Sequence, residues 1–430
     1  MDELIKKLKK NKNIRNFRIY KVLSKNTILG TFGKIIGGAY SPLENSSEIS
    51  GELHIEWNNG NISKININAK ALEDPAYIIS RAKSIQIKDP YSKEFLKKYS
   101  LSNPRNQYSQ KVSRIISKDQ TKLINEIQKL YDLEENLGIN KHILEVDAST
   151  GEIELQNSKG LHLKEKVSSY NISSSWKMIL SFGISKRKYF EIEDLREDFT
   201  FYSKMFKTKD KRLNLTKTDK TDVKVILDPY FCWSLLNSFL FSNLRGSLVA
   251  NDQSSFKKTD FKNQKKVFAD WFTLKINPKK KLTVGATDFT NEGLENKLTE
   301  FIKDGKLMTP ILDLKHAQKL DMPPTSFITS PNITSFSSKK SYELQNYIKR
   351  IDKGIYLPYG LGLHTQNHIT GDYSLPCPHA FYIKNGKFTG KTKVIIIGNI
   401  FQELKHNLDL VSTNLFPTPG ICYNPQVVFE

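Results

Sequence analysis

The feature that most constrains this sequence is a predicted helix that is apolar on nearly every side. It covers residues 228–246, DPYFCWSLLNSFLFSNLRG, where Asp228 is a suitable N-cap and Pro229 suits the first helical position. We expect Gly246 to end the helix. A helix without a polar face is buried on several sides. The chain must therefore build a large core around it, and its 430 residues suffice for roughly two or three domains.

The first part of the sequence predicts two helices and a hairpin. A short amphipathic helix opens the chain, and apolar residues recur at helical spacing over residues 119–136. Over residues 52–68, apolar and polar residues alternate on both sides of Asn59-Gly60. That dipeptide favours a type I′ turn, so we predict a two-stranded hairpin there.

Short strands are predicted between residues 143 and 175. Runs of alternating apolar and polar residues are interrupted by Thr150-Gly151 and by Lys159-Gly160. Both dipeptides are typical of turns, so we expect each of them to separate two strands.

The second half of the sequence predicts several hairpins and few helices. Tight turns are expected at Asp304-Gly305 and at Asn385-Gly386, and a strand, KVIIIG, leads into a helix capped by Asn399. The fold class is therefore α+β. We expect an N-terminal α/β sandwich-like region, followed by a mainly antiparallel, barrel-like C-terminal domain that contains the buried helix.

We predict three regions along the chain. They are an α+β region at 1–100, a helix with a β-sheet region at 101–222 that ends in a basic loop, and a β-rich domain at 223–430. The boundary rests on Lys204–Lys224, a basic run with little apolar content.

The net charge of +21 favours anionic partners, but no zinc finger, helix-turn-helix or RNP-type motif accompanies it. We therefore do not expect nucleic acid as a partner. No run of about 18 apolar residues predicts a membrane-spanning helix. The N-terminus lacks the apolar segment of a secretory signal, and three scattered cysteines do not suit a disulfide framework. These observations favour a cytoplasmic protein without a membrane partner.

The search for chemistry gives one candidate cluster. None of the eight histidines is followed by Glu, so the sequence has no HExxH or HExxxH zinc motif. His364, His368, Cys377 and His379 lie close in sequence, although flanking glycines argue against a helix that would bring them together. A polar loop is the alternative explanation. Cys232, within the apolar helix, and Cys422 are interpreted as inert thiols.

Residues 354–404 resemble the TldD/PmbA family, and specifically its TldE (PmbA) members. The resemblance is carried by GLHTQNHITGDYS, by the FYIKNGKF hairpin, and by KVIIIGN followed by FQEL. Earlier segments agree in order: DFTNEG at 288–293, EFIKDGKLMTPILD, and SPNIT at 330–334. The segment 223–246 falls where TldD members carry their HExxxH helix. The resemblance is good over 223–430 and weak over 1–200.

The resemblance implies a non-catalytic subunit. TldD members are zinc metallopeptidases, and TldE members lack the zinc motif but pair with TldD to enclose a chamber that cleaves unfolded peptides. This chain is thus expected to bind no cofactor itself, to form a heterodimer with a zinc-containing TldD-type partner, and to contact unfolded peptide. The expected substrate-binding residues are in the loop that carries the resemblance: His364, Thr365, Asn367, Gly371, Asp372 and Ser374.

Two alternatives stay open from the sequence. One is a divergent metallopeptidase that uses His364, Cys377 and His379. The other is a nucleic-acid-binding regulator similar to the family members described as modulators of DNA gyrase. For Asp372 a structural role in a turn at Gly371-Asp372 is the alternative to peptide binding.

Overall fold

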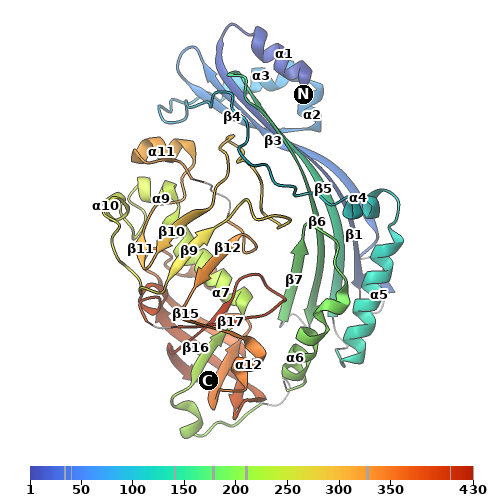
Figure 1. The fold of residues 1–430 in the computed structure, drawn as a ribbon, viewed down its shortest axis with the longest axis vertical. Helices are drawn as coiled ribbons and strands as arrows, with labels where there is room; N and C mark the ends of the chain where they lie inside the picture. The colour runs from blue at the N-terminus through green and yellow to red at the C-terminus, as the bar shows by residue number, and fades with distance from the viewer. Residues whose placement is uncertain are drawn as a thin grey trace.

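The N-terminal half of the chain builds one long curved sheet, and the C-terminal half packs against its concave side (Figure 1). The computed structural model describes residues 1–32, 35–39, 41–139, 142–176, 180–208, 212–325, 329–406 and 408–429. The middle of the basic run used as a boundary, residues 209–211, lies outside the described residues. The domain boundaries therefore stay predictions.

The long sheet is antiparallel and has the order β4-β3-β1-β5-β6-β7, with β2 paired to β1. Its strands are β1 Ile14–Phe32, β2 Ile35–Ile36, β3 Glu44–Trp57, β4 Ile62–Asn68, β5 His142–Asn157, β6 His162–Trp176 and β7 Leu180–Lys186. Strands from the predicted regions 1–100 and 101–222 thus share one sheet. The sheet spans both regions because β1 pairs directly with β5 from Arg18↔Asn157 to Gly30↔Glu145.

Helices cover parts of this sheet. They are α1 Asp2–Lys10, α2 Ala69–Glu73, α3 Pro75–Ser84, α4 Gln110–Ser117, α5 Thr121–Asn136 and α6 Arg196–Lys207. The first three lie at one end of the long strands, and α4, α5 and α6 lie towards the other (Figure 1). The predicted N-terminal helix is confirmed, since Leu4, Ile5 and Leu8 are buried, and so is the helix predicted over 119–136.

The largest sheet of the C-terminal half has the order β13-β17-β18-β8-β14-β15-β16-β19. Its strands are β8 Lys224–Leu227, β13 Lys340–Glu343, β14 Lys353–Leu357, β15 Asp372–Lys384, β16 Lys387–Asn399, β17 Asp409–Ser412, β18 Gly420–Tyr423 and β19 Gln426–Phe429. Most neighbours are antiparallel, as predicted. The barrel-like description is wrong, because β13 and β19 are edge strands that do not pair with each other and the sheet stays open.

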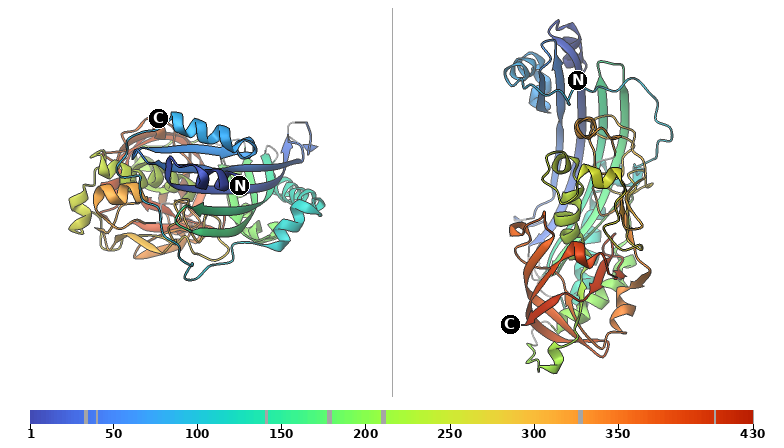
Figure 2. Two further views of the ribbon diagram at one scale, coloured as in Figure 1. Left: turned by 90° about the horizontal axis from the view of Figure 1, so that it is seen from above. Right: turned by 90° about the vertical axis from the view of Figure 1, so that its left-hand side faces the viewer.

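A second, smaller sheet lies between this sheet and the α1–α3 end (Figure 1). Its order is β11-β10-β9-β12, with β9 Thr273–Ile276, β10 Thr299–Lys303, β11 Lys306–Leu307 and β12 Thr334–Ser337. Short helices complete this half: α9 Gly246–Ala250, α10 Lys258–Lys262, α11 Leu314–Leu320, α12 Leu344–Ile348 and α13 Ile400–Glu403. Figure 2 shows the resulting elongated molecule in two further views.

The apolar helix is buried, as predicted. It consists of α7 Pro229–Leu236, a π-helical turn Asn237–Phe241 and α8 Ser242–Leu244, and it packs within a large core shared by both C-terminal sheets. The Asp228 carboxylate caps it by accepting a hydrogen bond from the Tyr230 N–H at 2.8 Å. The predicted end was wrong by two residues, since Arg245 has extended backbone and Gly246 already begins α9.

The tight turns were predicted with mixed success. Asp304-Gly305 and Asn385-Gly386 both have positive φ at the two residues, as a type I′ turn requires. At Asn59-Gly60 only the glycine has positive φ, at 81°, so the predicted type I′ turn is wrong. There the Trp57 N–H donates to the Asn61 carbonyl and the Gly60 N–H donates to the Trp57 carbonyl. The loop therefore contains more residues than the two of a type I′ turn.

Thr150-Gly151 does not separate two strands. It lies within β5, where Gly151 is paired with β1 on one side and with β6 on the other. The Val167 side chain of β6 comes within 2.9 Å of the place that a Cβ would take. Gly151 is therefore a close-packing position in a long strand, whereas Lys159-Gly160 forms the predicted turn between β5 and β6.

Buried polar contacts join the two halves. Arg18 of β1 is only 2% exposed, and its guanidinium lies 3.6 Å from the Glu292 carboxylate of the C-terminal half. The Glu165 carboxylate of β6 accepts a hydrogen bond from the Asp288 N–H at 2.9 Å. Both partners in the C-terminal half belong to the DFTNEG segment. Among the described residues, no helix combines the length and hydropathy needed to cross a membrane.

Candidate functional site

The loop from β14 to β15 and the start of β15 carry the six predicted substrate-binding residues: His364, Thr365, Asn367, Gly371, Asp372 and Ser374. All but the glycine have exposed side chains, whereas Gly371 itself is buried. On β15 the exposed residues alternate with buried ones, which turns Asp372 and Ser374 towards solvent. The loop thus presents polar groups outward, and their contact with a peptide stays a prediction.

The base of this loop is fixed to α13. The Gly371 carbonyl accepts a hydrogen bond from the Ile400 N–H at 2.9 Å. The Asn399 side chain donates to the Asp372 carboxylate at 2.7 Å and to the Thr370 carbonyl at 2.9 Å. Hydrogen bonds from Asn399 and Thr370 lower the pKa of Asp372 below its ordinary value. Asp372 therefore has structural contacts, with Asn399 of β16 and with Thr370 of its own turn.

The backbone conformation at position 371 and the neighbouring Phe401 ring both require glycine. Its φ is 82°, and a Cβ at this position would lie 2.6 Å from the Phe401 ring. An L-side chain is strained by that φ and is also excluded by the ring. The loop consequently lies directly on Phe401 of α13.

Asn243, at the end of the apolar helix, holds the loop from the other side. Its side-chain amide donates to the His368 carbonyl at 2.7 Å and to the Phe239 carbonyl at 2.9 Å, and its oxygen accepts from the Ser255 N–H at 2.7 Å. Asn243 is 1% exposed. Asn243 was not predicted from the sequence as a residue of the site. An Asn within an apolar helix is nevertheless a usable signal for a buried polar contact.

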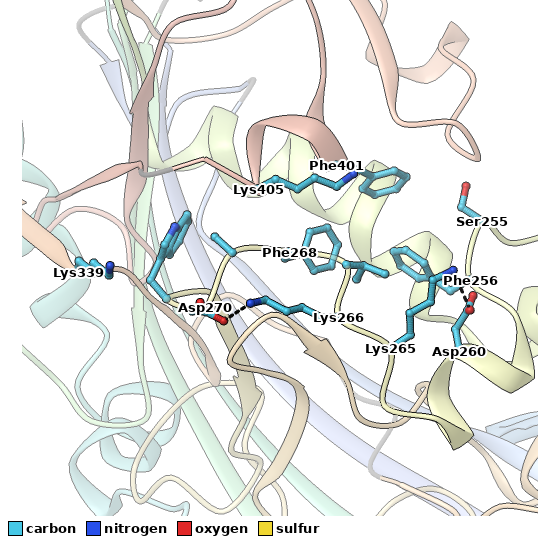
Figure 3. A pocket seen from close by; sticks show the side chains of 13 residues that line it. Ser255, Phe256, Asp260, Lys265, Lys266, Phe268, Asp270, Lys339, Phe401 and Lys405 are labelled. Atoms are coloured by element: carbon cyan, nitrogen blue, oxygen red, sulfur yellow. Dashed lines mark ion pairs between the residues drawn. The ribbon is translucent and has the colours of Figure 1, made fainter.

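A pocket of about 650 Å³ lies beside the loop (Figure 3). Phe256, Phe268 and Phe401 line it and contact one another, with ring centroids 5.5–6.4 Å apart. The pocket shares residues with the loop's supports, because the Ser255 hydroxyl donates to the Ile369 carbonyl and Phe401 underlies Gly371. The pocket thus adjoins the loop through Ser255 and Phe401, although none of the six predicted residues lines it.

Charged groups surround the phenylalanines. Lys265 pairs with Asp260 at 3.1 Å, and Lys266 pairs with Asp270 (Figure 3). Two further lysines, Lys339 and Lys405, line the pocket and make no ion pair with another described residue. The lining therefore combines aromatic surface with a net positive charge, a composition suited to the side chains and carboxylates of a peptide.

The alternative zinc ligands are not brought together. Within the described ranges, no three His, Cys, Asp or Glu side chains are grouped so that they can hold a metal ion. Cys377 is buried in β15, and burial raises its pKa to about 12. His379 lies in a register shift of β15 beside Tyr359, whereas His364 is on the exposed loop. These residues do not fit a zinc site.

The other two thiols are also unsuited to catalysis. Cys232 lies within α7 and Cys422 within β18, and both are buried. Burial raises the pKa of Cys232, and it raises that of Cys422 to about 11. Their interpretation as inert core thiols agrees with these environments.

Comparison with known proteins shows which family this chain resembles. Residues 220–430 match the family model of the PmbA/TldA metallopeptidase C-terminal domain. The chain is 24% identical over 204 residues to a metalloprotease PmbA homologue of Buchnera aphidicola, covering 47% of this chain and 45% of that one. The chain belongs to the TldD/PmbA family. Metalloprotease PmbA of Escherichia coli O157:H7 is 24% identical over 179 residues, 41% of this chain and 39% of its own. Both PmbA matches thus span less than half of the relative's length.

Longer matches extend the similarity over the whole chain. An uncharacterized protein of Methanocaldococcus jannaschii is 24% identical over 365 residues, 82% of each chain. The crystal structure of TldE from Thermococcus kodakarensis matches with a TM-score of 0.78 at 15% identity, covering 99% of both chains. A candidate DNA gyrase modulator from Bacteroides thetaiotaomicron matches with a TM-score of 0.75 at 19% identity, covering 100% of this chain and 97% of that one. At such identities the two structures establish the fold alone.

The motifs that carry the TldD/PmbA resemblance also have structural roles. DFTNEG joins the C-terminal half to the long sheet, where Gly293, with a φ of 86°, packs against Leu155 and Leu161. Asn399 caps α13 by accepting hydrogen bonds from the Phe401 and Gln402 N–H groups, as predicted. Part of the family pattern therefore builds the scaffold of the site.

Proposed function

We propose that this TldD/PmbA protein is a TldE-like, non-catalytic subunit that pairs with a TldD-type zinc metallopeptidase. In this proposal it supplies part of the wall of the chamber in which unfolded peptides are cleaved. Family membership and the TldE fold support the proposal. Zinc is assigned to the partner, because His364, Cys377 and His379 do not fit a zinc site and the described residues contain no other group of metal ligands. We assign no step of hydrolysis to these side chains.

One observation carries the peptide-binding role: the aromatic pocket adjoins the loop through Ser255 and Phe401. Its volume of about 650 Å³ is within the range of ligand-binding clefts, roughly 300–1,000 Å³. An apolar side chain of an extended peptide is proposed to contact Phe256, Phe268 and Phe401. Lys339 and Lys405 are then available to a peptide carboxylate, and the exposed groups of the loop are available to the peptide backbone.

The binding role is tested in the complex reconstituted with a TldD-type partner, by exchanging Lys405 for Glu. We expect KM for an acidic unfolded peptide to rise several-fold with kcat nearly unchanged, because Lys405 is assigned only to binding that is equal in ground and transition states. Lys9→Glu, in the remote helix α1, is the control with the same charge change and should leave KM as it was. A loss of kcat without a change in KM would argue against a binding site at this pocket.

Asp372→Asn separates a binding role from a structural one. The amide oxygen can still accept from Asn399, so a purely structural Asp372 predicts an almost unchanged KM and a melting temperature lower by at most about 1–2 °C, for a loss of up to ~1 kcal/mol. A peptide contact predicts a raised KM at an unchanged melting temperature. Measuring both quantities on the same preparation assigns the residue, and a raised KM is the result our proposal expects.

A further inference from the structure

A second pocket, of about 810 Å³, shares no lining residue with the pocket beside the loop. It lies between α6, α12 and the turn that joins β15 to β16. Figure 1 shows α6 and α12 at the end of the molecule opposite α1. Nothing in the proposed peptidase role uses this pocket.

The floor of the pocket is apolar. Phe201 of α6 and Phe388 of β16 are half-buried, with ring centroids 5.8 Å apart, and Ile348 of α12 is buried beside them. Phe388 is held from behind by Tyr356 and Phe381, at centroid distances of 6.1 and 6.4 Å. The three side chains thus offer a fixed apolar surface that a single aromatic or aliphatic side chain can cover.

The rim of the pocket is basic. Lys204, Lys349 and Lys387 are exposed around the floor, with Glu197 as the acidic side chain of the lining. Lys349 donates to the neutral Asn346 side chain at 3.3 Å, and neither Lys204 nor Lys387 forms a salt bridge with another described residue. These three ammonium groups are therefore not neutralised within the described chain.

We propose that this pocket docks an acidic peptide segment of a partner protein, with one aromatic or aliphatic side chain inserted onto the phenylalanine floor. The three lysines surround the floor, which suits several separate carboxylates better than one compact phosphate. The arginine of the lining, Arg196, is already engaged by Glu193 through two contacts, so it does not offer the free guanidinium that phosphate recognition favours. The net charge of +21 adds a field that attracts an acidic segment.

The test is fluorescence anisotropy on the full chain with a labelled nine-residue peptide of Asp and Glu around one central Phe. The double variant Lys204→Glu/Lys387→Glu should weaken binding about tenfold, because two attractive contacts become repulsive. The control Lys6→Glu/Lys9→Glu, on exposed residues of α1, makes the same change in net charge and should retain most of the affinity. A peptide with Ser in place of Phe should also bind about tenfold more weakly.

Three results would overturn the proposal. Equal losses in the pocket variant and the control would show non-specific attraction to the net charge. Equal binding of the Phe and Ser peptides would show that the apolar floor is not used. Tighter binding of a DNA duplex that is lost in the pocket variant would assign the pocket to nucleic acid. Circular dichroism and melting temperature of each variant establish that the fold is retained, and none of these results depends on a metallopeptidase partner.

Discussion

At the scale of single residues, Asn243 connects three segments that lie far apart in the chain. It is fully buried, and its hydrogen bonds reach the apolar helix, the segment at Ser255 and the loop at His368. Asn243→Ala should lower the free energy of unfolding by about 2–4 kcal/mol, because buried partners lose their hydrogen bonds. Urea denaturation measures this loss. Ser234→Ala, at a more exposed position of the same helix, should change stability by less than about 0.5 kcal/mol; equal effects would refute the role of Asn243.

Glu165 should make the stability of the protein pH-dependent. Burial raises its pKa from an ordinary value near 4.5 to about 7, with the Asp288 carboxylate acting in the same direction and Arg187 and Lys279 opposing. Between pH 4.5 and about 7 the folded state therefore keeps a proton on Glu165 that the unfolded state has released. This contribution to stability is fully present below pH 4.5 and is lost as pH rises through about 7.

Glu165→Gln removes that titration while keeping an acceptor for the Asp288 N–H. Unfolding free energies at pH 5 and pH 8 should differ less in the variant than in the parent chain, and the variant should be the more stable of the two at pH 8. Glu152→Gln, at an exposed residue of β5, is the control and should leave the pH dependence unchanged. An unchanged pH dependence in Glu165→Gln would contradict the assignment.

At the scale of elements, the loop depends on how closely it packs on α13. Gly371→Ala should destabilise the protein by about 1–3 kcal/mol, because the φ of 82° and the Phe401 ring both exclude a Cβ. Displacement of Phe401 should also raise KM for peptide in the reconstituted complex. Gly183→Ala in β7 is the matched control, since its φ is ordinary and its nearest neighbour is 3.6 Å away. Equal melting temperatures for the two variants would show that the loop is loosely packed.

Signals that act between neighbours in sequence were sufficient to predict many elements. The Asp228 cap, the Asn399 cap and the turn at Asn385-Gly386 were found because each depends on residues a few positions apart. The apolar helix was found because its composition demands burial on any fold.

The larger errors arise where pairing between residues far apart in the sequence decides the structure. Gly151 has the composition of a turn, yet pairing with β1 and β6 keeps it in a strand. The open eight-stranded sheet depends on parallel pairing of β8 with β14 and of β13 with β17, which hairpin signals do not reveal. Likewise, the contact of Asn243 with His368 joins residues 125 positions apart. The residues of the loop were thus predictable, but their supports were not.

At the scale of the whole molecule, the long sheet and the C-terminal half are joined by buried charged groups. Arg18 lies near both Glu292 and Glu52, at 3.6 and 3.8 Å. Breaking a buried pair by removing one partner costs about 3–5 kcal/mol, because the other charge stays buried. Arg18→Met should therefore lower the melting temperature strongly. Adding Glu292→Gln to Arg18→Met should restore part of the lost melting temperature, because it removes the charge left unpaired. If the double variant is no more stable than Arg18→Met, the two residues do not interact energetically.

The central claim concerns the assembly: this chain contributes binding surface and its partner contributes zinc. The most direct measurement is peptide hydrolysis by the purified chain alone, by a TldD-type protein carrying HExxxH alone, and by the two mixed, with zinc content determined for each. The account predicts a stable complex of the two proteins, zinc in the HExxxH protein, and chelator-sensitive hydrolysis that is highest in the mixture. Stoichiometric zinc in the isolated chain, together with hydrolysis by it that a chelator abolishes, would contradict the account.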